Sequence, residues 1–403
     1  MSILKSLIIA SLYRLGLCFV PAFKSRFSSS IRNSQLSMAS ATPLTDLCHI
    51  SKEACDAVSP MLLAFYKKIS AGESSATKLK SDATFFSIAD GIVQHMFIEH
   101  LFKGNKFYDI VGEEDETKVN IVTKPYTVDD LVVPEEFDGL IESTLKKVQQ
   151  LSTKIDQEAY KGITIFVDPI DGTREFATKQ GDKVTVLIGY NNKEGRPVAG
   201  ITYRPLTEPP TWAAGALSEN CKLGNLDMAK EPKPRGILVT DGKVSPWLGK
   251  LIDVLGYEKI GSLASGNRAL MILEGKAGAY IRDTGGFAKW DTSGPQAVFE
   301  AYGCTMSKLP AFIAEQKLES YTHLKATDNL DYQQGKTVLT LHNARDKSAF
   351  KKDEVTIVGS VKELKEYSCL CGLVALDTYN MQRLPEIQAA MKKAVETHDP
   401  LYT

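Results

Sequence analysis

The chain has 403 residues and a formal net charge of -1, with ordinary apolar, aromatic and charged fractions. This length provides enough material for one large domain or two ordinary ones. The charge balance excludes a global basic field for nucleic-acid polymers and an acidic solvating tail. The seven cysteines are scattered without C-x-x-C spacing, so they indicate reduced thiols, and the pair Cys369 and Cys371 has no assigned role.

The first 45 residues differ in composition from the rest of the chain. They are rich in arginine and serine, contain no acidic residue before Asp46, and carry an apolar stretch that Arg14 interrupts. That stretch is shorter than a membrane span, and the composition is typical of a transit peptide. The segment resembles the two-part plastid presequences of algae, in which a residue like Phe23 follows a small residue. We predict a removable presequence over 1–45, with a plastid favoured. The alternatives are a mitochondrial presequence, or a cytoplasmic protein with a tail from which translation restarts at Met38.

The next elements in chain order are two helices and a group of strands. Apolar residues recur at helical spacing over 47–69 and over 85–102, and Asp90 lies near the edge of the second stripe. Short runs typical of strands follow at 107–115, 162–171, 183–192 and 197–206. The turn sequence NNKEGR predicts that the last two form a hairpin.

A second alternation of strands and helices follows. It comprises a strand at 235–242, a helix near 247–256, a mixed run at 258–283 and a helix after 289–296. Pro295 suits the first turn of that last helix, with Thr292 or Ser293 as its cap. We interpret the polar stretch 305–367 as a variable surface insertion, after which β character returns at 371–378. These alternating runs predict an α/β fold of stacked layers. The expected organisation is a single domain over 46–403, with two sub-domains that meet near residue 228.

The stretch FVDPIDGTREF, residues 166–176, places two carboxylates three positions apart. Asp168 is predicted to end a strand, Pro169 fixes the backbone, and Asp171 with Gly172 makes a tight turn before a helix that Thr173 opens. Such a turn can aim both carboxylates and the Ile170 carbonyl at one Mg²⁺ or Mn²⁺ ion. The free N–H groups of Gly172 and Thr173 would attract an anion. The alternative is an ordinary surface turn capped by aspartate.

More carboxylates lie at the ends of other predicted elements. Glu113 and Glu114 follow a strand and a glycine, Asp90 lies on the second helix, and Asp291 lies at the start of a later helix. Each alone is typical of a solvated loop or a helix cap. Together with Asp168 and Asp171 they indicate a metal centre.

These motifs carry a family resemblance. The set IAD, GEED, DPIDGT and WDT resembles the magnesium-dependent, lithium-sensitive phosphomonoesterases, which include bisphosphate nucleotidases and inositol phosphatases. The resemblance covers about residues 45–303 and resumes near 372. It implies a layered α-β-α-β-α sandwich of the inositol monophosphatase and fructose-1,6-bisphosphatase type. It also implies two or three Mg²⁺ ions and a small phosphorylated substrate, with no nucleic-acid polymer as partner and no stable membrane insertion. The oligomeric state is left open.

The resemblance also implies roles for individual residues. Glu113, Asp168 and the Ile170 carbonyl would hold one ion, and Asp168, Asp171 and Asp291 a second, with Glu114 supporting them. Asp90 and Thr173 would orient the attacking water and receive its proton. The predicted substrate contacts are Gly172, Thr173, Lys243, Ser265, Gly266 and Arg268.

Two substrates follow from the resemblance. DGT and GEED favour a 3'(2'),5'-bisphosphate nucleotidase, which converts 3'-phosphoadenosine 5'-phosphate to AMP and phosphate. The long insertion and a loop at 239–245 without the nucleotidases' histidine favour an inositol polyphosphate 1-phosphatase acting on inositol 1,4-bisphosphate. Some family members carry out both reactions. A binding protein without catalysis is a third hypothesis, which the retained carboxylates disfavour.

Overall fold

The computed structural model describes a defined part of the chain. The described residues are 43–70, 87–113, 117–155, 158–228, 235–239, 244–262, 264–284, 287–324, 330–333, 336–339, 367–369 and 372–400. Glu114, Lys243 and residues 1–42 of the predicted presequence lie outside them. The last three residues of that segment, 43–45, begin the first helix of the fold, and the Leu44 and Thr45 N–H groups donate to the Glu219 carboxylate. Residues 42–403 form one compact unit. Within the described part, no helix has the length and apolar character needed to cross a membrane.

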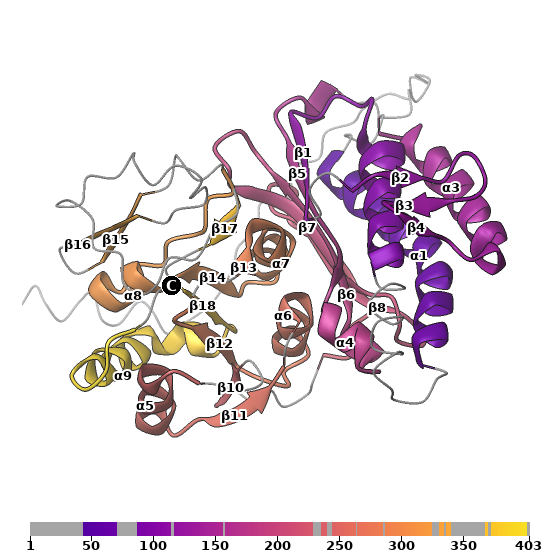
Figure 1. The fold of residues 1–403 in the computed structure, drawn as a ribbon. Coiled ribbons are helices and arrows are strands. Elements are labelled where there is room, and N and C mark those ends of the chain that lie inside the picture. The colour runs from indigo at the N-terminus through magenta and orange to yellow at the C-terminus, as the bar shows by residue number, and fades with distance from the viewer. Residues whose placement is uncertain are drawn as a thin grey trace, which may run out of the picture. The chain divides into compact units, whose positions relative to one another are not determined.

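A six-stranded sheet forms the first half of the fold. Its order is β1 (Asp109–Gly112), β5 (Thr164–Asp171), β6 (Thr185–Asn191), β7 (Pro197–Arg204), β8 (Thr211–Ala216) and β9 (Cys221–Gly224). β1 lies parallel to β5, and the other neighbours are antiparallel. The predicted hairpin is confirmed as β6–β7, with Gly195 at positive φ in its turn. Every residue of β6 is buried because helices cover both faces of the sheet (Figure 1).

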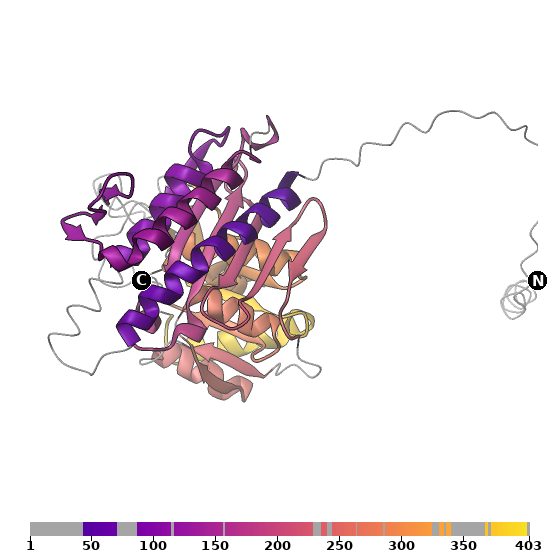
Figure 2. The same cartoon turned by 90° about the vertical axis from the view of Figure 1, so that its right-hand side faces the viewer.

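Three helices lie on one side of this sheet (Figure 2). They are α1 (Pro43–Ser70), α3 (Asp138–Ser152) and the helix at 87–102, whose last residues form the π-helix η1 (Met96–Phe102). α1 and the helix at 87–102 contact the strands, and α3 packs on those two helices. Both helices predicted in this region are therefore confirmed over their described residues. Polar contacts join α1 to the sheet, since the Ser51 hydroxyl lies 2.5 Å from the Tyr190 hydroxyl. The short strands β2 (Val119–Asn120), β3 (Thr127–Val128) and β4 (Leu131–Val132) form a separate small sheet.

On the other face, α6 (Ser265–Leu273) and α7 (Lys289–Ala301) contact the strands. The approach of α7 is close: a Cβ atom added to Gly189 on β6 would lie 2.5 Å from the backbone nitrogen of Gly294. Glycines at these positions therefore let the helix backbone rest directly on the sheet.

The predicted start of α7 is wrong. The helix begins at Lys289, so Thr292 and Ser293 lie inside it and Pro295 is an interior residue. Acceptors that come later in the chain satisfy the first N–H groups of the helix. The Lys289 N–H donates to the Tyr367 carbonyl, and the Ala288 N–H donates to the Asp291 carboxylate. A helix that is already capped at residue 288 needs no cap from Thr292 or Ser293.

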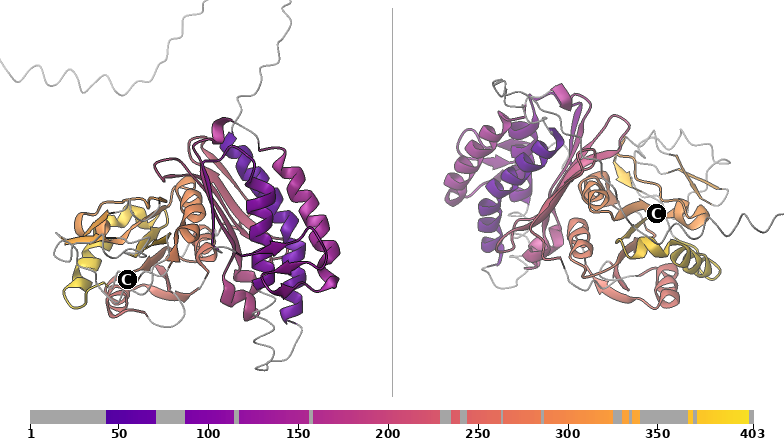
Figure 3. Two further views of the ribbon diagram at one scale, coloured as in Figure 1. Left: turned by 45° about the horizontal axis from the view of Figure 1, so that its top comes forward. Right: turned by 180° about the vertical axis from the view of Figure 1, so that it is seen from behind.

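A five-stranded sheet forms the second half. Its order is β11 (Glu258–Gly261), β10 (Gly236–Val239), β12 (Ala279–Arg282), β18 (Leu373–Leu376) and β14 (Thr305–Lys308). One face packs on α6 and α7, and the other packs on α5 (Pro246–Leu255), α8 (Leu309–Glu315) and α9 (Leu384–Val395). Figure 3 shows α6 and α7 between the two sheets. The predicted α-β-α-β-α sandwich is confirmed.

The remaining elements are short. They are β13 (Phe287–Ala288), β15 (Leu330–Gln333), β16 (Lys336–Leu339), β17 (Ser368–Cys369), α4 (Thr173–Ala177) and the short helices η2 (Glu135–Phe137), η3 (Glu158–Tyr160), η4 (Gly181–Lys183) and η7 (Asn380–Arg383). β13 pairs with β17, and β15 pairs with β16.

The predicted insertion at 305–367 begins too early. β14 pairs with β18 in the second sheet, and Met306, Leu309 and Phe312 are core residues. The strand was missed because its polar Ser307 is buried and bonds to Glu319 instead of lying at the surface. Most of the segment after residue 324 lies outside the described residues.

Candidate active site

The two aspartates of the DPIDGT motif lie in a bulged strand, not in a turn after it. β5 continues through Asp168 to Asp171, which corrects the predicted strand end at Asp168. Asp168 pairs with Leu187 and Asp171 pairs with Thr185. A shift of three residues along β5 therefore corresponds to a shift of two residues along β6. The bulge leaves Pro169 and Ile170 out of the paired register. Gly172 then adopts φ 101°, a conformation that favours glycine, and α4 begins at Thr173 as predicted.

The structure brings the predicted carboxylates together. Asp168, Asp171 and Asp291 each offer an oxygen within 4.8 Å of the others, although Asp291 comes from the first turn of α7. Glu113 follows β1, and its N–H donates to the Val167 carbonyl across the parallel pair. Its carboxylate is close enough to raise the pKa of Asp168 by hydrogen bonding and repulsion.

Two carboxylates of the cluster, those of Asp168 and Asp291, have raised pKa values because of burial and repulsion from neighbouring carboxylates. Burial, followed by repulsion from Glu113, Asp171 and Asp291, raises the pKa of Asp168 well above its ordinary value. Burial and then the Asp171 charge raise the pKa of Asp291 to about 6. Among the described residues, one Asp168 oxygen, Oδ1, is buried with no hydrogen-bond partner. Like charges, hard oxygen ligands and an unpartnered buried oxygen together fit a divalent cation such as Mg²⁺.

Asp171 is held by donors from two elements. The Ser265 and Gly266 N–H groups at the start of α6 donate to its carboxylate at 3.0 and 2.7 Å. The Thr185 hydroxyl donates at 2.5 Å, and the Ser265 hydroxyl donates at 3.2 Å. Ser265 and Gly266 were predicted to contact substrate, and that stays a prediction; in the structure their backbone N–H groups bind the Asp171 carboxylate. The sequence pattern gave no signal for this contact, because 94 residues separate Asp171 from Ser265.

Arg268 lies beside this cluster but is buried. Only 4% of it is exposed, its guanidinium carbon stands 4.3 Å from the centre of the Tyr280 ring, and its Nη1 donates to the Ser262 carbonyl at 3.2 Å. Its Nε has no hydrogen-bond partner among the described residues. A pocket lined by Ser265, Arg268, Tyr280 and Asp291 connects it to the acidic cluster. In this structure the guanidinium contacts Ser262 and Tyr280 and is shielded from solvent.

The two predicted water-activating residues lie on elements next to the cluster. Asp90 is buried on the helix at 87–102, and Gln94 of the same helix is in contact range of Gly112 at the end of β1, next to Glu113. Thr173 is the exposed first residue of α4. Glu114 and Lys243 lie outside the described residues, so their predicted roles stay predictions.

A buried lysine and histidine support the start of α7, and sequence reasoning missed both. Lys289 Nζ donates to the Thr322 and Leu324 carbonyls, and His323 bonds to the Thr292 hydroxyl. Burial lowers the pKa of His323 to about 3, which agrees with a histidine that stays neutral. Residues 322–324 fall within the predicted insertion, so their packing against the helix of Asp291 had no sequence signal.

The chain matches the inositol monophosphatase family over residues 44–327, a range that contains every described member of the acidic cluster. The protein is therefore a phosphoric monoester hydrolase. It belongs to the inositol monophosphatase family.

The chain is similar to two relatives and one solved structure. A Mus musculus protein named 3'(2'),5'-bisphosphate nucleotidase 1 is 28% identical over 239 residues, which is 57% of this chain and 71% of the relative. Its Homo sapiens namesake is 22% identical over 269 residues, or 64% of this chain and 83% of the relative. The solved structure of an inositol monophosphatase from Zymomonas mobilis covers 87% of this chain and 100% of its own, with a TM-score of 0.49 and 13% identity.

Proposed function

We propose that this phosphomonoesterase depends on magnesium and removes the 3'-phosphate of 3'-phosphoadenosine 5'-phosphate, releasing AMP and phosphate. The observation that supports the chemistry is the cluster of Asp168, Asp171 and Asp291, whose oxygens lie within 4.8 Å of one another, with Asp168 and Asp171 buried and Asp291 half-buried. The names of the mouse and human relatives support the nucleotide as substrate. The DGT and GEED motifs support it too.

The carboxylates divide into two ligand sets. Glu113, Asp168 and the Ile170 carbonyl would hold one ion, and Asp168, Asp171 and Asp291 would hold a second. The bulge in β5 supports the first set, because it removes Ile170 from the paired register. When bound, the ions supply a water of lowered pKa and neutralise the charge that develops on the leaving oxygen.

The protein's own groups position the reactants. Asp90 and Thr173 orient the water for attack in line with the leaving oxygen and take up its proton. The N–H groups of Gly172 and Thr173 would bind the phosphate. Asp171 is kept in place by its donors from Thr185, Ser265 and Gly266. No covalent phosphoenzyme is needed for this route.

A second substrate, inositol 1,4-bisphosphate, is favoured by one sequence observation. The loop VTDGKVS at 239–245 contains no histidine, and Lys243 stands in the part of the loop expected to contact the nucleotide. Arg268 can bind a phosphate of either molecule through its planar fork.

The test is phosphate release from the two bisphosphates in parallel, with magnesium and then with added lithium. We expect magnesium-dependent, lithium-sensitive release, with the higher kcat/KM for 3'-phosphoadenosine 5'-phosphate. A kcat/KM well above this for inositol 1,4-bisphosphate would assign the enzyme to the alternative substrate. No release from either substrate would reject the proposed function.

Arg268→Ala is expected to lower kcat/KM selectively for bisphosphate substrates. If the guanidinium binds the phosphate that is not hydrolysed, losing a charge-assisted hydrogen bond of ~1.5–3 kcal/mol lowers kcat/KM by roughly ten- to a hundredfold. Monophosphates should lose far less. Arg268→Lys is the matched control, because lysine retains the charge and is the residue expected in nucleotidases. Equal losses on mono- and bisphosphates would show that Arg268 acts only through its packing on Tyr280.

A further inference from the structure

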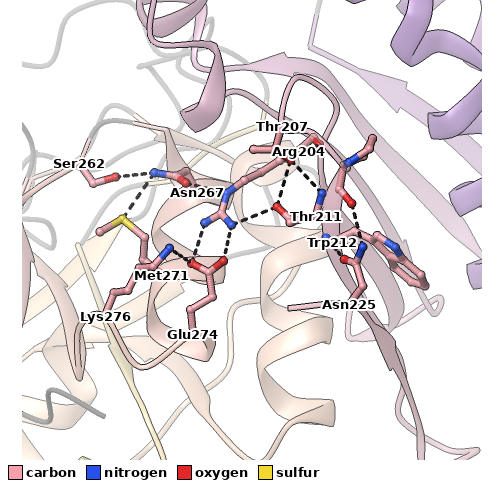
Figure 4. A network of polar contacts seen from close by, with 11 residues as sticks. Arg204, Thr207, Thr211, Trp212, Asn225, Ser262, Asn267, Met271, Glu274 and Lys276 are labelled. Carbon is pink, nitrogen blue, oxygen red and sulfur yellow. Dashed lines mark hydrogen bonds and ion pairs between the residues drawn. The ribbon is translucent and has the colours of Figure 1, made fainter. Parts of the chain in front are cut away.

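A buried ion pair joins the end of β7 to the far end of α6 (Figure 4). Arg204 donates through Nη1 and Nη2 to the two oxygens of Glu274 at 2.6 and 3.2 Å. Both residues are buried, with exposed fractions of 4% and 5%. Lys276 reaches the same carboxylate at 2.8 Å from the surface, and Thr211 accepts from Nη1 at 3.3 Å.

The same guanidinium also reaches the beginning of α6. Its Nε donates to the Asn267 side-chain oxygen at 2.9 Å, and the Asn267 amide donates to the Ser262 hydroxyl at 3.1 Å. Arg204 therefore contacts α6 at its third residue and just beyond its last residue. A single side chain from the sheet therefore bonds near both ends of the helix.

The first turn of α6 is the part that holds Asp171. The Ser265 and Gly266 N–H groups donate to that carboxylate, and Asn267 is the next residue along the chain. The helix also has no room to move toward the sheet, because a Cβ atom on Gly266 would lie 2.5 Å from the Thr185 hydroxyl oxygen. Contact with β6 limits movement toward the sheet, and the bonds of Arg204 act on both ends of the helix.

We propose that Arg204, Asn267 and Glu274 form a positioning clasp that holds the first turn of α6 against Asp171 and so prepares this carboxylate for a divalent cation. The clasp rests on the proposed function, since it acts on a metal ligand of that site. None of the three residues touches the cluster directly, so each is a positioning residue.

Stability alone does not account for such a pair. Replacing a buried ion pair by apolar residues is often neutral or stabilising, whereas removing one partner costs ~3–5 kcal/mol. The double variant Arg204→Met/Glu274→Met therefore separates the two roles. If the ion pair is purely structural, the double variant should have normal stability and normal metal affinity. If the pair belongs to the positioning clasp, the double variant should have normal stability and weakened metal affinity.

The experiment is calorimetric titration of Mg²⁺ into the full chain without substrate, alongside urea unfolding. We expect the double variant to fold with near-normal stability and to bind Mg²⁺ about tenfold more weakly, the lower end of the range for residues that support metal ligands. Arg383→Met/Glu386→Met is the matched control, since it removes another arginine–glutamate pair, on the exposed start of α9, and should leave Mg²⁺ affinity unchanged.

A second variant keeps the test decisive if the double variant does not fold. Asn267→Ala leaves the Arg204–Glu274 pair in place and removes the bond from Arg204 to the first turn, together with the Asn267 bonds to Ser262 and Met271. It should also weaken Mg²⁺ binding about tenfold, while Asn267→Asp keeps the acceptor for Arg204 and should restore affinity to within about twofold. Normal Mg²⁺ affinity in the folded double variant or in Asn267→Ala overturns the clasp and leaves the proposed function standing. If the unmodified chain binds no Mg²⁺, the metal site and the clasp fail together.

Discussion

Asp168→Asn is expected to reduce magnesium-dependent phosphate release by roughly a thousandfold or more while leaving a folded protein. Asp168 belongs to both proposed ligand sets, and its Oδ1 is the buried oxygen that has no hydrogen-bond partner among the described residues. The neutral amide removes charge that the other carboxylates cannot replace. Phosphate release under saturating magnesium measures the effect, and near-normal activity in the variant would reject the site assignment.

The same substitution is expected to stabilise the protein when metal is removed. The pKa of Asp168 is raised in the folded state by burial and then by Glu113, Asp171 and Asp291. The folded state therefore binds protons more readily than the unfolded state, so stability from this group is present at acid pH and is lost as pH rises through the raised pKa. Near pH 7.5 in the presence of chelator, the free energy of unfolding of the Asp168→Asn variant should be ~1–3 kcal/mol higher than that of the unmodified chain. Near pH 4 the difference should shrink, and urea unfolding at the two pH values checks this.

Gly189→Ala is expected to destabilise the protein strongly, although it adds only one methyl group. That group would lie 2.5 Å from the backbone nitrogen of Gly294, so either β6 or α7 must move. Such overpacking lowers the free energy of unfolding by about 3 kcal/mol when the neighbouring atoms that must move belong to the backbone. Because α7 also carries Asp291, Mg²⁺ affinity should fall together with stability.

Gly139→Ala is the matched control for this prediction. Gly139 lies in α3, where an added Cβ atom meets nothing within 4 Å. Alanine should therefore stabilise this helix by about 0.5–1 kcal/mol and leave metal affinity unchanged. Urea unfolding of both variants is the measurement. Equal stability in Gly189→Ala and the unmodified chain would show that the backbone of α7 does not rest directly on the sheet.

Local patterns in the sequence predicted the elements whose partners are near in the chain. Periodic apolar residues located α1 and the helix at 87–102, and the turn NNKEGR located the β6–β7 hairpin. The motif around Asp168 and Asp171 indicated two of the clustered carboxylates, because a proline and a glycine restrict the backbone there. The strand itself continues to Asp171 and does not end at Asp168 as predicted.

Contacts between distant segments could not be predicted in this way. α7 starts at Lys289 because Tyr367, from a segment 78 residues later, accepts its N–H. Asp171 is held by the first turn of α6, and Arg204 holds that turn through residues 63 and 70 positions away. β14 pairs antiparallel with β18, more than sixty residues further on, so its polar residues gave no local sign of burial. In each case the determining partner is brought in by the tertiary fold.

The most direct test of the proposed metal site is a crystal structure of the full chain grown with Mn²⁺ and inorganic phosphate, with manganese located by its anomalous scattering. Mn²⁺ prefers the same oxygen ligands as Mg²⁺ and can be identified unambiguously. We expect manganese bonded to Asp168 and shared with Asp171 and Asp291, with Glu113 as a further ligand and phosphate alongside. Manganese bound elsewhere, with these carboxylates bare, would contradict the proposed site.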